Sequence, residues 1–147
     1  MKNNHLLKVA LAQIRPVWFK KKATLLKIKN SISEAAKNHA ELIIFGEGLL
    51  PGYPFWLALT NGAAWNTKMN KELHAHYINN SVTIENGDLN ELCALAKKHQ
   101  IAIYLGIIEC PPEIKTASAR TAMLFSRTNT LLSLPMLLSM VAAQNLY

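Results

Sequence analysis

The sequence predicts an α/β fold over residues 1–115, because short apolar runs typical of strands alternate with longer segments of helical periodicity. The chain has 147 residues, of which 50% are hydrophobic and 17% are charged, and this is enough to bury one modest core. Residues 116–147 contain no Asp, Glu, Lys or Gly, unlike an ordinary globular surface. We therefore expect a regular part over 1–115 and an atypical, irregular tail over 116–147.

Three strands are predicted from apolar, partly β-branched runs. The first should be short and largely buried, and the second is typical of a sheet covered on both faces. The runs occupy residues 8–14, 41–46 and 101–108.

Helices are predicted between these strands and beside them. Residues 20–38 place Leu25, Ile28 and Ile32 on one face, and a second helix is expected over 66–79. Asp88 is followed three residues later by Glu91, which is the capping-box spacing and predicts a third helix that Asp88 caps and that ends near residue 100.

The tail has no clear strand or helix periodicity. Its apolar stretch over 131–143 is 13 residues long and is interrupted by Pro135, so we do not expect it to span a membrane. The polar N-terminus does not resemble a secretory signal, and the two cysteines form no CxxC pair. A reducing cytoplasm is therefore the expected location.

The formal net charge of +7 does not by itself indicate a nucleic-acid partner. The tight basic cluster over 20–22 falls on a predicted helix face, and no nucleic-acid-binding motif accompanies it. His74 and His76 are two residues apart on a predicted helix and would diverge, so no metal site is expected.

The loop after the second predicted strand carries the strongest chemical signal. Glu47 lies between two glycines at the carboxyl end of that strand, where ligands collect in open α/β sheets. Aromatic residues follow it, and a carboxylate that they partly desolvate would suit a general base. The alternative from physical chemistry alone is a solvated loop glutamate. The aromatic neighbours are Phe45, Tyr53, Phe55 and Trp56.

The order of several motifs over residues 6–110 resembles the N-terminal part of the nitrilase superfamily of carbon–nitrogen hydrolases. The Gly-Tyr-Pro motif resembles the one found at this place in the nitrilase branch of that superfamily. The motifs are Lys8-Val-Ala-Leu-Ala-Gln13, Ala40-Glu-Leu-Ile-Ile-Phe-Gly-Glu47, Gly52-Tyr-Pro54, Tyr77-Ile-Asn-Asn-Ser-Val82, Leu95-Ala-Lys-Lys-His99 and Ile103-Tyr-Leu-Gly-Ile-Ile-Glu109.

This resemblance implies the first half of an α-β-β-α sandwich, in a family that forms homo-oligomers through helices packed between chains. It implies that Glu47 is the general base of a Glu-Lys-Cys triad that converts a nitrile to a carboxylic acid and ammonia, without a metal or organic cofactor. Tyr53 and Trp56 are the expected substrate-binding residues. For Trp56 and Trp65, which flank the loop, the alternative to lining a pocket is packing of the loop onto the body of the domain.

The family's lysine and nucleophilic cysteine have no counterparts at their expected places. Cys93 falls on a predicted helix face, Cys110 follows the third strand, and Lys115 precedes the expected position of the lysine. We therefore expect an inactive fragment, from a truncated or frameshifted gene that the other two reading frames would reveal. The alternative is a non-catalytic interaction subunit that pairs with a full-length homologue through an uncovered sheet face.

Overall fold

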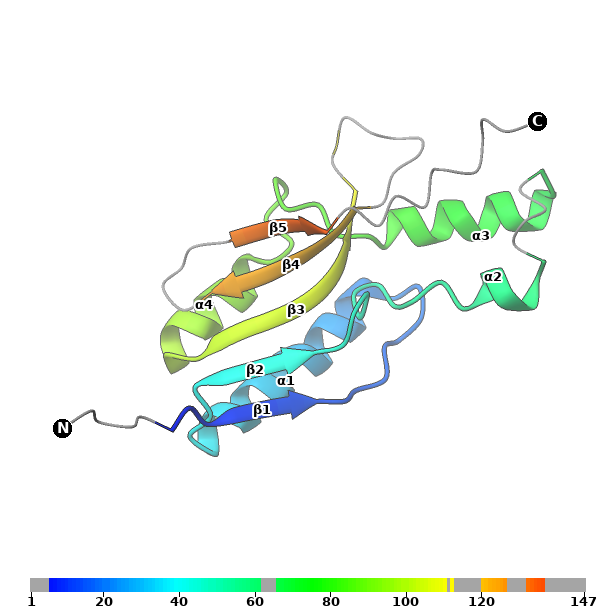
Figure 1. Ribbon diagram of the computed structural model, residues 1–147. Coiled ribbons are helices and arrows are strands. Elements are labelled where there is room, and N and C mark those ends of the chain that lie inside the picture. The colour runs from blue at the N-terminus through cyan, green and yellow to red at the C-terminus, as the bar shows by residue number, and fades with distance from the viewer. Residues whose placement is uncertain (1–5, 62–65, 111, 113–119, 127–131, 137–147) are drawn as a thin grey trace.

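A five-stranded sheet in the order β1-β2-β3-β4-β5 forms the centre of the computed structural model (Figure 1). The structure describes residues 6–61, 66–110, 112, 120–126 and 132–136. Strands β1, β2 and β3 are parallel, whereas β4 runs antiparallel to both β3 and β5. The α/β class is thus confirmed. The strands are β1 (Val9–Ala12), β2 (Leu42–Phe45), β3 (Ala102–Glu109), β4 (Arg120–Ser126) and β5 (Leu132–Met136).

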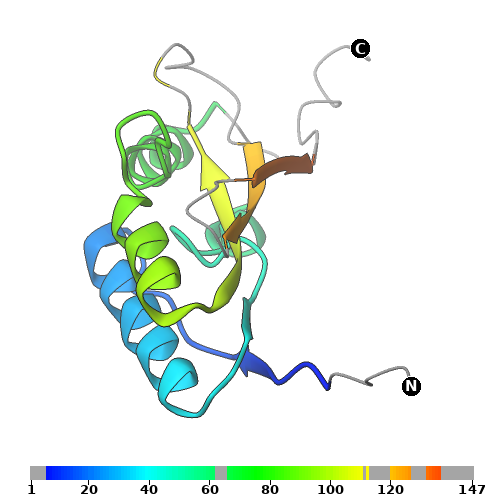
Figure 2. The same ribbon diagram turned by 90° about the vertical axis from the view of Figure 1, so that its left-hand side faces the viewer.

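Two of the helices cover one face of the sheet, as Figure 2 shows. These are α1 (Lys21–Lys37) and α4 (Asn90–His99), both close to their predicted ranges. Helix α3 (Lys68–Asn79) and the short α2 (Trp56–Leu59), which the sequence did not predict, lie beyond the carboxyl ends of the parallel strands (Figure 1).

The hydrophobic core lies between the sheet and helices α1 and α4. Alternate residues of β2 and β3 point into it, and the side chains of Ile43, Ile103 and Leu105 are buried. Ile28 of α1 and Leu92 of α4 meet them from the other side. Each such side chain contributes about 1.5–3 kcal/mol by leaving water, so this layer supplies most of the stability.

Strand β1 differs from its predicted burial. Val9 is 42% exposed and Leu11 is 79% exposed, because β1 is an edge strand and both residues lie on the face that α1 and α4 do not cover. The expectation of a largely buried first strand was therefore wrong. Apolar composition alone does not distinguish an edge strand from a central one.

The predicted capping box at the start of α4 is absent. The N-cap residue is Leu89, and no side chain caps the helix. Asp88 instead accepts a hydrogen bond from the Thr83 N–H (2.8 Å) and forms an ion pair with the Lys21 ammonium (2.5 Å). These contacts use the carboxylate that the cap would need and connect α1 to the loop before α4.

The structure also contains two strands after residue 115, where an irregular tail was expected. Strand β4 pairs with β3 from Ile103 opposite Ser126 to Glu109 opposite Arg120. Pro135 lies in β5, which is an edge strand, and such a strand tolerates the missing N–H. Strand pairing through the backbone needs no charge alternation, which explains why the composition did not reveal these strands. The separate origin of residues 116–147 stays a prediction.

Replacing Asp88 by Asn should lower the free energy of unfolding by about 1–2 kcal/mol, because the charged hydrogen bond to Lys21 is lost from a site where both side chains are 22% exposed. Urea unfolding followed by circular dichroism measures this change.

The matched control is Glu91→Gln. The Glu91 carboxylate forms an ion pair with the Lys29 ammonium at 2.6 Å, but the Glu91 side chain lies on the surface. The free energy of unfolding of the Glu91→Gln variant should therefore hardly differ from that of the parent. Equal losses in both variants would contradict the structural role of Asp88.

Candidate active site

The turn that carries Glu47 follows β2 and crosses β3 at Gly106. A Cβ added at Gly106 would lie 2.6 Å from the Glu47 Cα and 2.6 Å from the Gly46 carbonyl oxygen, so only glycine permits this approach. The Leu50 N–H donates to the Gly106 carbonyl (3.3 Å), and the Ile108 N–H donates to the Leu50 carbonyl (2.8 Å). Sequence reasoning placed Gly106 in the third strand but did not assign it this role, because the contact depends on the strand register.

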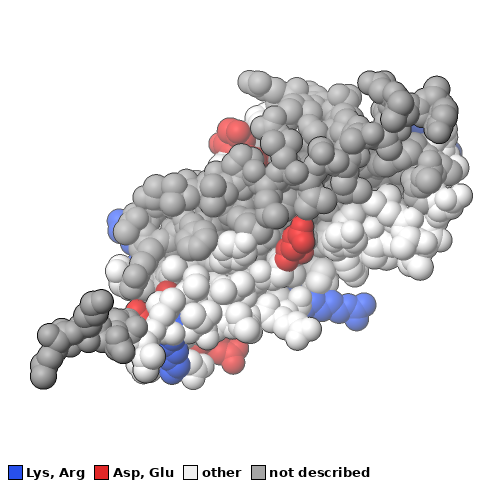
Figure 3. All heavy atoms as spheres, in the orientation of Figure 1, with Lys and Arg blue, Asp and Glu red and all other residues white. Residues whose placement is uncertain are grey.

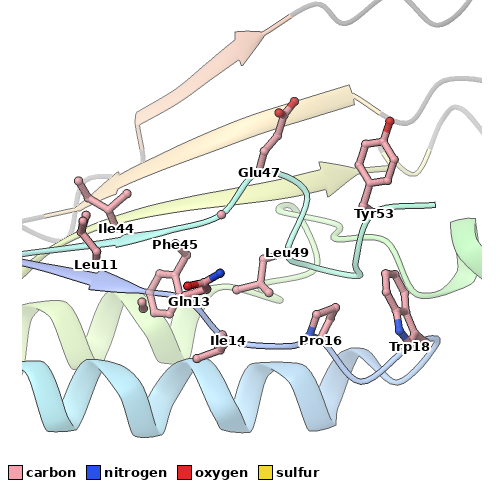
Figure 4. Close-up of a pocket in the computed structure, with 12 residues that line it drawn as sticks. Leu11, Gln13, Ile14, Pro16, Trp18, Ile44, Phe45, Glu47, Leu49 and Tyr53 are labelled. Atoms are coloured by element: carbon pink, nitrogen blue, oxygen red, sulfur yellow. The ribbon is translucent and has the colours of Figure 1, made fainter. Parts of the chain in front are cut away.

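A hollow of about 390 Å³ lies beside this turn, at the carboxyl ends of β1 and β2 (Figure 4). Most of its lining is apolar. Glu47 and Tyr53 extend to the side away from α1, whereas Ile14 points toward α1. The lining residues are Leu11, Ala12, Gln13, Ile14, Pro16, Trp18, Ile44, Phe45, Gly46, Glu47, Leu49 and Tyr53.

Glu47 is exposed, so the partial burial expected from its aromatic neighbours is not found. Tyr53 is 66% exposed and lines the same hollow, whereas Trp56 is buried and is not among the lining residues. The hollow therefore brings together Glu47 and Tyr53 but not Trp56. Trp65 lies outside the described residues.

The buried Trp56 and Tyr77 pack against each other and against the half-buried Phe19 instead of covering Glu47. Trp56 contacts Phe19 with ring centroids 5.3 Å apart and Tyr77 with centroids 4.8 Å apart. Burial, with a smaller contribution from Tyr53, raises the pKa of Tyr77 above its ordinary value. The ring cluster anchors α2 and α3 beyond the end of the sheet.

Trp18 positions the Gly-Tyr-Pro loop. Gly52 has a φ of +119°, and a Cβ there would lie 2.5 Å from the Trp18 ring and 3.2 Å from Pro16. Trp18 also contacts Phe55, with ring centroids 4.5 Å apart. Trp18 thus connects the chain after β1 to the loop that holds Tyr53, and these two segments form walls of the hollow.

Within the described residues, neither cysteine shares the hollow with Glu47. Cys93 is buried in α4, and Cys110 lines a second hollow with Lys21 and Thr83. Burial raises the pKa of both thiols, which lowers the thiolate fraction at neutral pH. The Lys21 ammonium donates hydrogen bonds to Asp88 and to the Ser81 carbonyl. Lys115 lies outside the described part of the chain.

His74 and His76 both lie on α3, as expected. In the described part of the chain, His, Cys, Asp and Glu form no group of three that could hold a metal ion. None of the helices described here has the length and apolar character needed to cross a membrane.

Comparison with known proteins points to one family. The family model for carbon-nitrogen hydrolases matches residues 8–138. The chain is 36% identical over 103 residues to an arylacetonitrilase of Aspergillus oryzae, covering 70% of this chain and 29% of that protein. It is 31% identical over 124 residues to a protein named nitrilase 2 from an unknown prokaryotic organism, covering 84% of this chain and 38% of that protein.

Solved structures share the fold. The NitFhit protein of C. elegans matches with a TM-score of 0.54 and 14% identity, over 86% of this chain and 27% of that chain. A mutant amidase from Nesterenkonia sp. AN1, with an acetamide moiety on its active-site cysteine, matches with a TM-score of 0.54 and 16% identity, over 84% of this chain and 40% of that chain.

The extent of these matches has two consequences. The chain spans less than two thirds of the length of the relatives it matches, with 29% of the Aspergillus oryzae protein covered. The family match also continues past residue 115 through β4 and β5, although residues 116–147 were expected to form an atypical tail.

Replacing Gly52 by Ala should lower the free energy of unfolding by about 1–3 kcal/mol, because a side chain is strained at this φ and would collide with Trp18. Urea unfolding gives the change in stability, and tryptophan fluorescence reports the displacement of Trp18.

Gly46→Ala is the matched control in the same loop, since a Cβ there has nothing within 4 Å. If both variants unfold at the same urea concentration as the parent, Trp18 does not hold the loop.

Cys110 should react with iodoacetamide more slowly than glutathione at pH 7.5, because its raised pKa leaves less thiolate. The rate should rise as the pH increases beyond the ordinary thiol pKa. Peptide mapping by mass spectrometry separates Cys110 from the buried Cys93. Alkylation of Cys110 faster than that of glutathione would indicate an activated thiol.

Proposed function

The chain belongs to the carbon-nitrogen hydrolase family, and from this premise we propose that it supplies the general-base part of a nitrile-hydrolysing site. The observation that supports this proposal is the position of Glu47, at the carboxyl end of β2 and in the wall of an apolar hollow. Its backbone is held against β3 by the close approach at Gly106. A carboxylate on a fixed backbone beside an apolar hollow suits proton transfer to and from a bound substrate.

The proposed reaction converts R–C≡N and two water molecules to R–COOH and ammonia. A thiolate adds to the nitrile carbon to form a thioimidate, water then displaces ammonia to leave an acyl-enzyme, and a second water releases the acid. In this scheme Glu47 takes the thiol proton, delivers it to the substrate nitrogen and deprotonates each water. The thiolate and water supply the chemistry, so the scheme needs no metal or organic cofactor.

The substrate class that fits is a nitrile with an apolar or aromatic group. Leu11, Ile44 and Leu49 give the hollow an apolar lining, and the ring of Tyr53 lies on the same side of the sheet as Glu47 (Figure 4). The similarity to an arylacetonitrilase supports this choice. We assign Tyr53 to substrate contact, and Trp56 to holding the loop from its buried position.

We further propose that this chain does not catalyse the reaction alone. Cys110 lines a different hollow from Glu47, and Cys93 is buried in α4. Removing one member of a catalytic unit costs about as much rate as removing all of them, which is several orders of magnitude. Both cysteines are free thiols, which is compatible with the cytoplasmic location proposed for the chain.

The purified chain should release no ammonia from aryl or aliphatic nitriles above the level of its Glu47→Gln variant. The reason is that Glu47 has no thiol beside it from which to take a proton. Ammonia is measured with a coupled glutamate dehydrogenase assay.

Cys110→Ser provides the control for a relocated nucleophile. If the parent hydrolyses a nitrile and either substitution abolishes this activity, the proposal of an inactive fragment is wrong. Loss with Cys110→Ser would identify Cys110 as the nucleophile.

A second candidate function is a non-catalytic subunit that pairs with a full-length homologue. The observation that favours it is the exposed apolar surface on the side of the sheet away from α1 and α4, where Leu11 is 79% exposed. Size-exclusion chromatography with light scattering on a mixture of this chain and a full-length homologue tests this role. A discrete complex containing both chains supports this role, and separate elution of the two chains excludes it.

A further inference from the structure

Trp18 lies at one end of the hollow that Glu47 borders. Tyr53 lies at the same end, whereas Leu11 and Ile44 lie at the other (Figure 4). The Trp18 side chain is half-buried, so part of its indole ring is available to a molecule in the hollow. An aromatic group that contacts Tyr53 would therefore also meet the indole.

The turn that carries Trp18 is fixed to α1. The Lys20 N–H donates to the Val17 carbonyl (3.1 Å) and closes a β-turn with Trp18 at its tip. The buried Thr24 hydroxyl accepts a hydrogen bond from the Val17 N–H (3.0 Å) and donates one to the Val17 carbonyl (3.2 Å). These bonds set the position of the turn independently of anything in the hollow.

The second tip residue of this turn, Phe19, has a strained backbone. Its φ is +55°, which a bulky side chain rarely adopts. The Phe19 ring packs against the buried Trp56, and this contact holds the strained conformation. On the other side of the tip, Trp18 contacts Phe55 and leaves no room for a side chain at Gly52. Strain that surrounding contacts maintain is found mainly at functional sites, where it fixes a side chain in place.

We propose that Trp18 is a specificity-determining residue, whose indole limits the size of the aromatic group that the hollow accepts. This inference rests on the proposed function, with the nitrile group toward Glu47 and the aromatic group toward Tyr53. A wall that cannot move rejects a longer group, because the extra atoms would have to displace it. The substrates that fit are aryl nitriles without a large substituent on the ring position farthest from the nitrile.

The other side chains around the hollow are less able to set this limit. Leu11 is 79% exposed and Tyr53 is 66% exposed, so each can change rotamer without disturbing the core. Uncharged side chains occupy the middle of the surface over β1 and β2 (Figure 3). This surface favours an uncharged ligand and offers no charged group to select its length. The rigid Trp18 is thus the wall that discriminates by size.

Binding of two nitriles to the full chain tests the proposal. Phenylacetonitrile and its para-ethyl derivative are titrated separately, and the amide signals of Glu47 and Tyr53 are followed by NMR. The parent should bind phenylacetonitrile more tightly than the para-ethyl derivative. Trp18→Phe should shift the ratio of the two dissociation constants about tenfold in favour of the derivative, as expected when an apolar pocket gains room for a methylene group.

Trp56→Phe is the matched control, since it makes the same change in a buried tryptophan that is not among the lining residues. Its ratio of dissociation constants should equal that of the parent. Both nitriles bind the same folded state, so a loss of stability weakens the two affinities equally and leaves their ratio unchanged. Trp18→Leu is a second variant of the wall and should shift the ratio in the same direction as Trp18→Phe.

The results separate this inference from the proposed function. A parent that binds the para-ethyl derivative at least as tightly as phenylacetonitrile contradicts the role of Trp18 alone. The same holds for an unchanged ratio in a folded Trp18 variant, or for an equal shift in Trp56→Phe. A parent that binds neither nitrile contradicts the proposed function as well.

Discussion

The close approach of the Glu47 turn to β3 is the constraint on which the candidate site depends. Gly106 lets the backbone of Glu47 and Gly46 lie directly against the strand, and hydrogen bonds through Leu50 continue this contact. The carboxylate therefore projects from a fixed backbone, although its side chain is exposed. The hollow beside it has its second wall fixed by Trp18, which leaves no room for a side chain at Gly52. Two glycines at close contacts thus define the geometry of the site.

Coverage of the sheet on one face explains most of the remaining features. Helices α1 and α4 bury one face and create the core, as Figure 2 shows. On the other side Glu47 is solvated and Leu11 is exposed. A general base works best where water is excluded, so the solvated Glu47 agrees with the proposal that the chain is inactive alone.

The sequence predicted the elements whose signal is local and missed those that depend on partners. The apolar face of α1, with Ile28 and Ile32, and the buried run of β2 were recognisable because periodicity reports burial. Asp88 has the spacing of a cap, but Lys21 lies far away in the sequence and competes for it. Strand β4 forms by pairing with β3, which lies earlier in the sequence. The exposure of Glu47 likewise depends on which segments pack around it in the folded chain. Long-range contacts of this kind cannot be predicted from the pattern of a short sequence segment.

The proposed completion of the site uses the side of the sheet away from α1 and α4. Glu47 follows the carboxyl end of β2 and is exposed on this side, whereas the two helices and the core lie on the other (Figure 4). A polypeptide that carries a cysteine and a lysine would therefore reach Glu47 without displacing the core, because it would pack on a sheet face that the described helices leave open.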